Sequence, residues 1–338
     1  MLTKTINMKN ATSLLLIAGC VVASCTKEVS SPPSKQSNAD ELAISKPAID
    51  AVAAPYTIRT IAGVFEPSRS EPYLVNGPGP KAKFWKPHGI TVDGDGSIYV
   101  ADFLNSAIRK ITVQNNVYTE ALSYNQDTGG GLLPEAVGIS PGGTLYIVST
   151  GYGIRIYNKE KGIDVYDRIT NSDSNLDLEK DSKGVMWFVG YNSIGRITGT
   201  TIQRNVVNFS SLLAPNESLR GIGTGPNGVK YVSTATQLFK VTNEGKIIKL
   251  FPNEKFTFIS GIAVTKDGNT IYIAESNAVK KIVGNTITTI TGPLPMADGR
   301  DGVGAAADVV AANVALSNSE TALFVSDTRN TIRKITLF

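Results

Sequence analysis

Few side chains in this 338-residue chain are suited to covalent or acid–base chemistry. His88 is the single histidine, and the two cysteines, Cys20 and Cys25, both lie near the N-terminus. The body of the chain therefore has no disulfide, no cysteine nucleophile and no cysteine-based metal site. The most informative polar residue beside His88 is Arg220, because a guanidinium group selects carboxylate or phosphate partners. Whether the two residues meet depends on the elements that carry them.

The segment around His88 has the pattern of three short strands. Gly89–Val92 and Ile98–Ala101 are expected strands joined by the turn Asp93–Gly96, and Asp-Gly in a tight loop is a strong hairpin signal. A second turn, Asp102–Ser106, leads to a third strand at Ala107–Val113. The rest of the chain repeats this unit with variations.

An aromatic residue in the second strand marks each repeat. The intervals between marks run from 41 to 52 residues, about 45 on average, which is the length of a four-stranded propeller blade. The 32 glycines, 16 prolines and 41% apolar residues are typical of a turn-rich β protein. We therefore expect an all-β fold, a six-bladed β-propeller of four-stranded antiparallel blades. The marks are Tyr99, Tyr146, Trp187, Tyr231, Tyr272 and Phe324.

The two ends of the chain predict how the ring closes. The sixth unit stops at Phe338, directly after its third strand, while the strand-like segment Tyr56–Ala62 precedes the first unit. Its sequence TIRTIAG is similar to TITTITG at 286–292, in the fourth strand of unit five. We expect the N-terminal strand to complete the last blade, because this pairing removes an exposed sheet edge.

The sequence P-x-G-I-x-V-D-x-x-G-x-I-Y-V-A-D-x-x-N-x-x-I-R-K-I at 87–111 resembles the NHL repeat. Residues 63–87 and 292–307 are similar to the segment between blades in that family. The resemblance is strong in unit one, fair in units five and six, and degenerate in units two to four. It implies a six-bladed propeller but no single chemistry, since such propellers include adaptors, RNA binders, lyases and carbohydrate-linked exported proteins.

The ring predicts a ligand site at the mouth of the central channel. Blades one and four face each other, so His88 is expected opposite Arg220 in a largely apolar collar. Aromatic residues in nearby loops could stack on a sugar or grip a peptide. The alternative is that His88 and Arg220 hydrogen-bond to neighbouring loops and Trp85 packs between blades. The expected collar is His88, Val137, Leu176, Arg220, Ser260 and Val310, and the predicted ligand-binding residues are His88, Arg220, Trp85, Phe103, Tyr152 and Tyr191.

The charge of the chain gives no reason to expect nucleic acid. The formal net charge of +4 falls to about +2 once two lysines of the N-terminal segment are removed with it. Basic residues of the third strands, such as Arg109 and Arg333, are expected to be solvated or packed by their stems. The pair Asp93-x-Asp95 could suggest calcium, but an oxygen cage needs more ligands. We predict no metal, no cofactor and no nucleic-acid partner.

Residues 1–24 resemble the signal peptide of a bacterial lipoprotein. A basic start precedes the short apolar run Ala11–Ser24, and small residues precede Cys25, which is the expected lipidation site. Cys20 is a competing site, and a plain secretory signal with incidental cysteines is the alternative. Residues 25–55 are expected to form a flexible tether that spans roughly 30 Å on average. Residues 56–338 are the expected propeller.

These features favour a binding module over an enzyme. We expect an exported lipoprotein, anchored in the bacterial cell envelope, that presents its propeller to a glycan, a peptide or a partner protein. The alternative is a metal-dependent lactonase-like or lyase-like enzyme with its site at the channel mouth. The metal ligands that the sequence offers for it there are Asp177, Glu135 and Asn175.

Overall fold

The computed structural model describes residues 55–66, 74–122, 133–149, 153–168, 177–292 and 298–338. They belong to one compact unit, Val52–Phe338. Within these ranges the chain forms β-strands and short 3-10 turns, and no α-helix. None of these ranges contains a helix with the length and apolar character needed to cross a membrane. Cys25 and the predicted signal peptide and tether, up to residue 54, lie outside the described residues.

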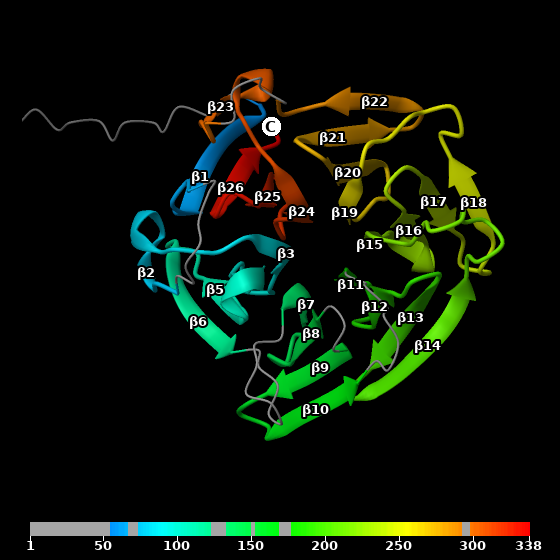
Figure 1. Cartoon of the computed structure of the whole chain (residues 1–338), viewed down its shortest axis with the longest axis horizontal. Coiled ribbons are helices and arrows are strands. Elements are labelled where there is room, and N and C mark those ends of the chain that lie inside the picture. The colour runs from blue at the N-terminus through cyan, green and yellow to red at the C-terminus, as the bar shows by residue number, and fades with distance from the viewer. Residues whose placement is uncertain (1–54, 67–73, 123–132, 150–152, 169–176, 293–297) are drawn as a thin grey trace, which may run out of the picture. The chain divides into compact units, whose positions relative to one another are not determined.

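Six antiparallel sheets surround a central axis as the blades of a propeller, which confirms the predicted fold class (Figure 1). Four of them are four-stranded. Blade two holds β7 Pro134–Ile139, β8 Leu145–Ser149, β9 Gly153–Asn158 and β10 Ile163–Arg168. Blade three holds β11 Leu178–Lys180, β12 Met186–Val189, β13 Ser193–Thr198 and β14 Thr201–Asn208. Blade four holds β15 Ile222–Thr224, β16 Lys230–Ser233, β17 Leu238–Val241 and β18 Ile247–Leu250. Blade five holds β19 Ile259–Val264, β20 Thr270–Glu275, β21 Ala278–Val283 and β22 Thr286–Thr289.

Blades one and six each carry an additional short fifth strand at the outer edge. Blade one holds β3 Pro87–Val92, β4 Ile98–Asp102, β5 Ala107–Ile111 and β6 Asn116–Leu122, capped by β2 Gly77–Pro78. Blade six holds β24 Ala311–Leu316, β25 Ala322–Asp327, β26 Thr331–Thr336 and β1 Thr57–Gly63, capped by β23 Gly302–Val303. These caps cover the outer edges of β6 and β1, where unpaired backbone groups would otherwise face solvent.

The ring is closed by the N-terminal strand, as the sequence predicted. Strand β1 pairs antiparallel with β26, with Ile58 opposite Ile335 and Gly63 opposite Thr331. Gly63 has φ of +89°, and a Cβ atom there would lie 2.2 Å from the Asn330 carbonyl oxygen, so this position requires glycine. The innermost strands β3, β7, β11, β15, β19 and β24 each lie beside the innermost strands of both neighbouring blades. Blades one and four, two and five, and three and six are therefore opposite one another.

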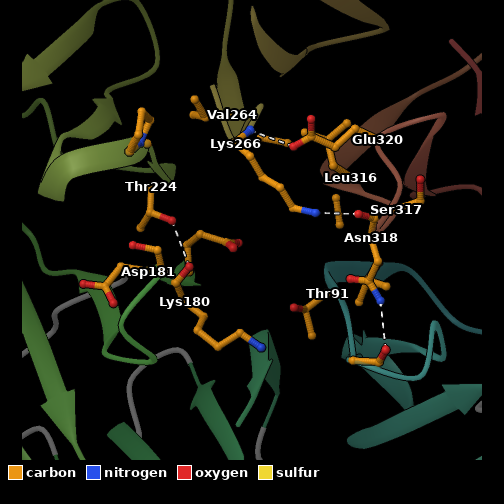
Figure 2. A pocket seen from close by; sticks show the side chains of 18 of the residues that line it. Thr91, Lys180, Asp181, Thr224, Val264, Lys266, Leu316, Ser317, Asn318 and Glu320 are labelled. Atoms are coloured by element: carbon orange, nitrogen blue, oxygen red, sulfur yellow. Dashed lines mark hydrogen bonds between the residues drawn. The ribbon is translucent and has the colours of Figure 1, made fainter. Parts of the chain in front are cut away.

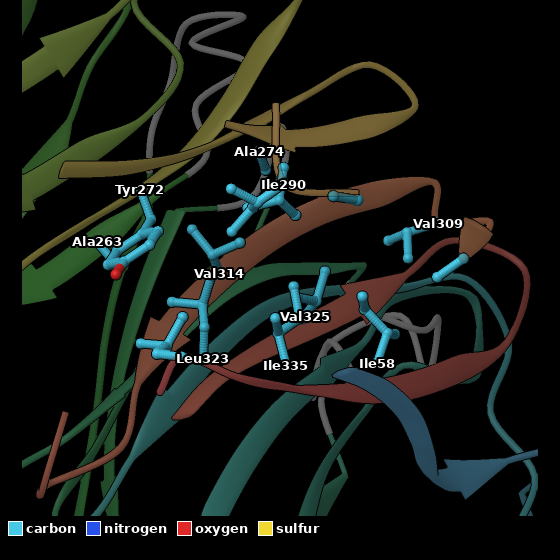
Figure 3. Close-up of a cluster of buried hydrophobic side chains, with 14 residues drawn as sticks. Ile58, Ala263, Tyr272, Ala274, Ile290, Val309, Val314, Leu323, Val325 and Ile335 are labelled. Atoms are coloured by element: carbon cyan, nitrogen blue, oxygen red, sulfur yellow. The ribbon is translucent and has the colours of Figure 1, made fainter. Parts of the chain in front are cut away.

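The hydrophobic core is distributed over the interfaces between adjacent blades. Figure 3 shows the interface of blades five and six, where Tyr272 lies with Val314, Val325 and Ile58. Each aromatic residue that marks a repeat occupies the interface with the blade that follows it. Burying a large apolar side chain stabilises a fold by about 1.5–3 kcal/mol, which gives a physical reason for the recurrence of these aromatics.

Two basic residues of the third strands differ from expectation. Arg109 and Arg333 are fully buried rather than solvated, and each pairs with a buried carboxylate, Asp102 or Asp327. A basic residue can be buried when its guanidinium is paired with a carboxylate and forms further hydrogen bonds. Both terminal nitrogens of each arginine are bonded in this way, whereas its Nε has no hydrogen-bond partner within the described residues. The alternation of polar residues along a strand does not reveal this pairing, since the carboxylate lies on the adjacent strand.

Candidate functional site

Strand register decides which residues stand at the channel mouth. The pairing of β7 with β8 places Glu135 of blade two at the position that His88 occupies in blade one. In blade six the pairing of β24 with β25 places Ala312 there. Val137 does not hold the blade-two position, because Gly138 pairs with Tyr146 and so corresponds to Thr91 of blade one rather than to Gly89. Val310 lies two residues before Ala312 and still lines the cavity at the channel mouth, as expected.

The distance to the repeat-marking aromatic was the signal that could have found Glu135. His88 lies eleven residues before Tyr99, and Glu135 lies eleven residues before Tyr146. Val137 lies only nine residues before that tyrosine. The aromatic residue is fixed by packing against the next blade, so it is a better reference than a glycine in a turn.

His88 is held in place by two contacts. Its Nδ1 lies 2.5 Å from Oε2 of Glu135, and its ring stacks on Phe103 with centroids 4.3 Å apart and planes 5° apart. The backbone oxygen of His88 accepts a hydrogen bond from the Ser326 hydroxyl. These contacts fix the ring orientation and put a carboxylate next to the imidazole.

Arg220 stands in blade four, across the ring. Its guanidinium lies over the Phe258 ring, 4.0 Å from the ring centroid. This stacking restricts the motion of the guanidinium and leaves its N–H groups able to donate hydrogen bonds in the plane of the group. Burial lowers the pKa of Arg220, and the negative charge of Glu135 opposes that shift. The guanidinium forms no hydrogen bond or ion pair with any residue in the described ranges. Arg220 is half-buried, and a guanidinium without a hydrogen-bond partner in such a place is costly, so a bound anion would be stabilised there.

A cavity of about 460 Å³ brings these residues together. His88, Glu135 and Arg220 line it with Ser260 and Asn277, so it combines charged groups with hydroxyl and amide groups. Small apolar residues of blade six form another part of the wall. This composition, a few polar groups in a concave surface, is the usual form of a small-molecule site.

The predicted aromatic residues have different places. Phe103 supports His88 through stacking. Trp85 is half-buried and donates its backbone N–H to Asp102 at 2.7 Å, and Tyr191 is 39% exposed; neither lines the cavity. Tyr152 lies outside the described residues, as does Leu176 of the expected collar. Glu135, which the sequence analysis considered only as a metal ligand for the alternative enzyme, lines the cavity, as do Asn277 and Thr328, which it did not include.

Asn313 lines this cavity and forms a hydrogen bond across the ring. Asn313 of blade six donates its side-chain N–H to Oδ1 of Asp177 in blade three at 2.8 Å. Asp177 also accepts the backbone N–H of Ile222 in blade four at 3.0 Å. Burial raises the pKa of Asp177 to about 7, although these hydrogen bonds favour its charged form.

A second cavity, of about 630 Å³, opens at the other end of the axis and shares no lining residue with the first. Figure 2 shows hydrogen bonds that connect the hairpin turns around it. The Lys266 ammonium donates to the Asn318 carbonyl at 2.6 Å, and the Asn318 side chain donates to the Asp93 carbonyl at 2.7 Å. Across the opening, the Thr224 hydroxyl donates to the Lys180 carbonyl at 2.8 Å. These bonds tie blades five, six and one together on one side, and blades three and four on the other.

The acidic turn and a serine motif have local roles. Asp93 accepts a hydrogen bond from the Gly94 amide, and Asp95 accepts hydrogen bonds from both the amide and the hydroxyl of Ser97, all within 3.0 Å.

A Gly-x-Ser-x-Gly sequence occurs at 138–142, but its Ser140 lies in a hairpin turn and accepts a hydrogen bond from the Thr144 amide. A nucleophile elbow, in contrast, lies between a strand and a helix. In the part of the chain that the structure describes, no three His, Cys, Asp or Glu side chains gather as metal ligands.

Comparisons with known proteins agree with the fold. Residues 84–111 match the NHL repeat family. No curated protein sequence is significantly similar to the chain. Among solved structures, an auxiliary nutrient binding protein from Bacteroides ovatus is 14% identical with a TM-score of 0.62, over 83% of this chain and 76% of that one. Virginiamycin B lyase from Staphylococcus aureus is 17% identical with a TM-score of 0.55, over 75% of this chain and 95% of that one.

A gluconolactonase from Xanthomonas campestris is 12% identical with a TM-score of 0.54, over 82% of this chain and 98% of that one. At these identities the likeness concerns the fold alone, and proteins with different activities share that fold. The repeat match, the closed ring and the blade pairing agree with one another. The chain is therefore a six-bladed β-propeller that carries an NHL repeat at residues 84–111.

Proposed function

We propose that this propeller is a binding module whose ligand, a small molecule or chain end with a carboxylate, occupies the His88 cavity. The observation that carries the proposal is the Arg220 guanidinium, which faces the cavity without a hydrogen-bond partner in the described residues. A guanidinium can hold a carboxylate through two parallel hydrogen bonds. The names of similar structures from Bacteroides, auxiliary nutrient binding proteins, support a binding role.

Two sources of a carboxylate agree with the earlier expectation of a glycan or peptide ligand. A glycan supplies it through a uronic acid, and a peptide supplies it at its C-terminus. Ser260 and Asn277 offer further hydrogen bonds to either. The aromatic support under His88 and Arg220 keeps both groups in place before the ligand arrives, which reduces the entropy cost of binding.

An array of uronic-acid oligosaccharides, neutral oligosaccharides, peptides with a free C-terminus and amidated peptides tests this proposal. We expect binding only to carboxylate ligands, with a loss of about 10- to 100-fold in Arg220→Ala, since hydrogen bonds to charged groups contribute about 1.5–3 kcal/mol. Arg204→Ala is the matched control, because Arg204 forms an exposed ion pair with Asp167 elsewhere on the propeller. Equal binding by wild type and Arg220→Ala contradicts the proposal.

One observation favours a second candidate, an enzyme at the same cavity. The Glu135 carboxylate next to His88 is an arrangement used for general acid–base chemistry. A lyase and a gluconolactonase are among the similar structures. Turnover of a lactone or an eliminable ester, lost in His88→Ala, would favour this candidate, and metal analysis of the purified protein would show whether a divalent ion takes part.

The proposal includes a membrane anchor at Cys25. The lipobox-like residues before Cys25 and the polar residues after it support this, and the propeller would then stand off the bacterial cell envelope on the tether. Metabolic labelling with a fatty-acid analogue tests the site. We expect the label to disappear in Cys25→Ala and to persist in Cys20→Ala, whereas a label that persists in Cys25→Ala contradicts the assignment.

A further inference from the structure

The second cavity contains a carboxyl group that forms no ion pair with a described residue, although the charge of Lys180 lies near it. Glu179 on β11 lines this cavity together with Thr91, Ala263 and Ala315. Apart from the amide of the next residue, Lys180, no described residue donates a hydrogen bond to the Glu179 carboxyl or forms an ion pair with it. A partly buried carboxyl in this situation is destabilising unless something else supplies the missing charge or hydrogen bonds.

The other charged side chains of the cavity wall already have partners. Lys180 and Lys266 donate their ammonium protons to backbone carbonyls at 3.0 and 2.6 Å. Asp181 accepts the indole N–H of Trp187 at 2.9 Å, and Glu320 accepts the backbone N–H of Lys266 at 2.6 Å. Asp177 lies two residues before Glu179 and belongs to the hydrogen bond across the axis. Glu179 is thus the charged group in the described lining that remains available to a ligand.

The repeats show that an acid is not required at this position. Glu179 pairs with Trp187, and the residue that pairs with the repeat-marking aromatic is small in every other blade. An architectural residue would recur, whereas this carboxyl occurs in blade three alone. The six residues at this position are Thr91, Gly138, Glu179, Gly223, Ala263 and Ala315.

We propose that this cavity binds an organic cation, with a primary ammonium group against the Glu179 carboxylate. An ammonium group has three donors, which the carboxylate and the Thr91 hydroxyl can accept. Val264 and Leu316 line the wall and provide apolar surface for the methylene groups of an amine. A divalent metal is a poorer match, since calcium takes about six to eight oxygen ligands and Glu179 is one available carboxylate. This site is independent of the proposed carboxylate site at the His88 cavity.

Calorimetric titration of the full chain tests the proposal with putrescine, propylamine, 1-propanol and calcium chloride as probes. We expect the two amines to bind, and 1-propanol and calcium not to bind. Glu179→Gln, which keeps the side-chain shape and removes the charge, should weaken amine binding at least about tenfold. Glu254→Gln is the control, because Glu254 is an exposed residue that does not line the cavity. It should bind amines as wild type does.

The pH profile gives a second readout. Burial, assisted by the charge of Asp177, raises the pKa of Glu179 to about 8. Amine binding should therefore tighten between pH 6 and pH 8.5, where the carboxyl ionises and the amine stays protonated, and Glu179→Gln should lack this change. Absence of amine binding at both pH values, equal affinity in Glu179→Gln, or binding of calcium in place of the amines would each overturn the proposal.

Discussion

Burying a carboxyl group costs free energy at the scale of a single residue, and β11 and the residue before it carry two such groups. Asp177 lies at the axis with hydrogen bonds to Asn313 and Ile222, whereas Glu179 faces a cavity. Burial is the main cause of the raised pKa of both, to about 7 and about 8. Such shifts are frequent at functional sites, where burial and neighbouring charges adjust the pKa of a group to its task.

Glu179→Gln should make stability less dependent on pH. A carboxyl whose pKa rises on folding stabilises the fold fully below its unfolded pKa and loses that contribution as pH rises through the folded pKa. For Glu179 this range runs from about pH 4.5 to about pH 8. Within it, the stabilising contribution falls by roughly 1.4 kcal/mol for each pH unit.

Urea unfolding at pH 5 and pH 8 measures the effect. Wild type should lose more stability than Glu179→Gln between the two pH values, and Asp177 should leave the variant with some residual dependence. An equal loss of stability in both proteins would show that the pKa of Glu179 is not raised in the folded state.

At the scale of an element, two buried arginines fix the segments between blades. Arg109 donates to Asp102 and to the carbonyls of Lys83 and Val75, all at 2.8 Å. It thereby ties the third strand of blade one to the segment before that blade. Arg333 does the same in blade six, through Asp327 and the carbonyls of Asp308 and Arg300. These two segments also provide the fifth strands β2 and β23, so the capped blades are the ones with the buried pair.

Arg109→Met should destabilise the propeller by about 3–5 kcal/mol, because it leaves Asp102 buried without its counter-charge. Arg204→Met removes an exposed pair with Asp167 and should cost less than about 1 kcal/mol. The free energy of unfolding from urea titration compares the two variants. A cost for Arg109→Met as small as that for Arg204→Met would show that the buried pair does not hold the segment.

At the scale of the whole molecule, the ring depends on one strand that comes from the other end of the chain. Strand β1 completes blade six, and its Ile58 is fully buried in the interface with blade five. Without β1, β26 has an open edge and the interface loses part of its apolar surface. In a closed ring each blade supports two neighbours, which makes unfolding cooperative.

A chain that begins after Gly63 should therefore lose its single cooperative unfolding transition and melt at a lower temperature. A chain that begins at Pro55 keeps β1 and is the control; it should melt as the complete protein does. Calorimetry of the three proteins measures the effect. An unchanged melting curve for the chain without β1 would mean that the closure strand contributes little.

The sequence by itself determined the architecture, because the information is local and repeated. Asp-Gly turns, alternating strand residues and one aromatic about every 45 residues predicted six blades and the closing strand. Each of these signals lies within one blade, or in the similarity of Thr57–Gly63 to residues 286–292. Short-range pattern is sufficient for such features, since a β-hairpin forms from neighbouring residues.

Only the tertiary structure decided which side chains meet at the axis. The pairing of β7 with β8 places Glu135 rather than Val137 at the channel mouth, and the contact of Asp177 with Asn313 joins residues 136 positions apart. Glu179 likewise has no ion-pair partner in the described part of the chain, because the charged side chains around it, which come from several blades, bond to other groups. Ring contacts join segments that are distant in the sequence, so they leave no local pattern to detect. The place of Glu135 did leave one, its eleven-residue distance from Tyr146, but only the strand pairing shows that this distance is the right reference.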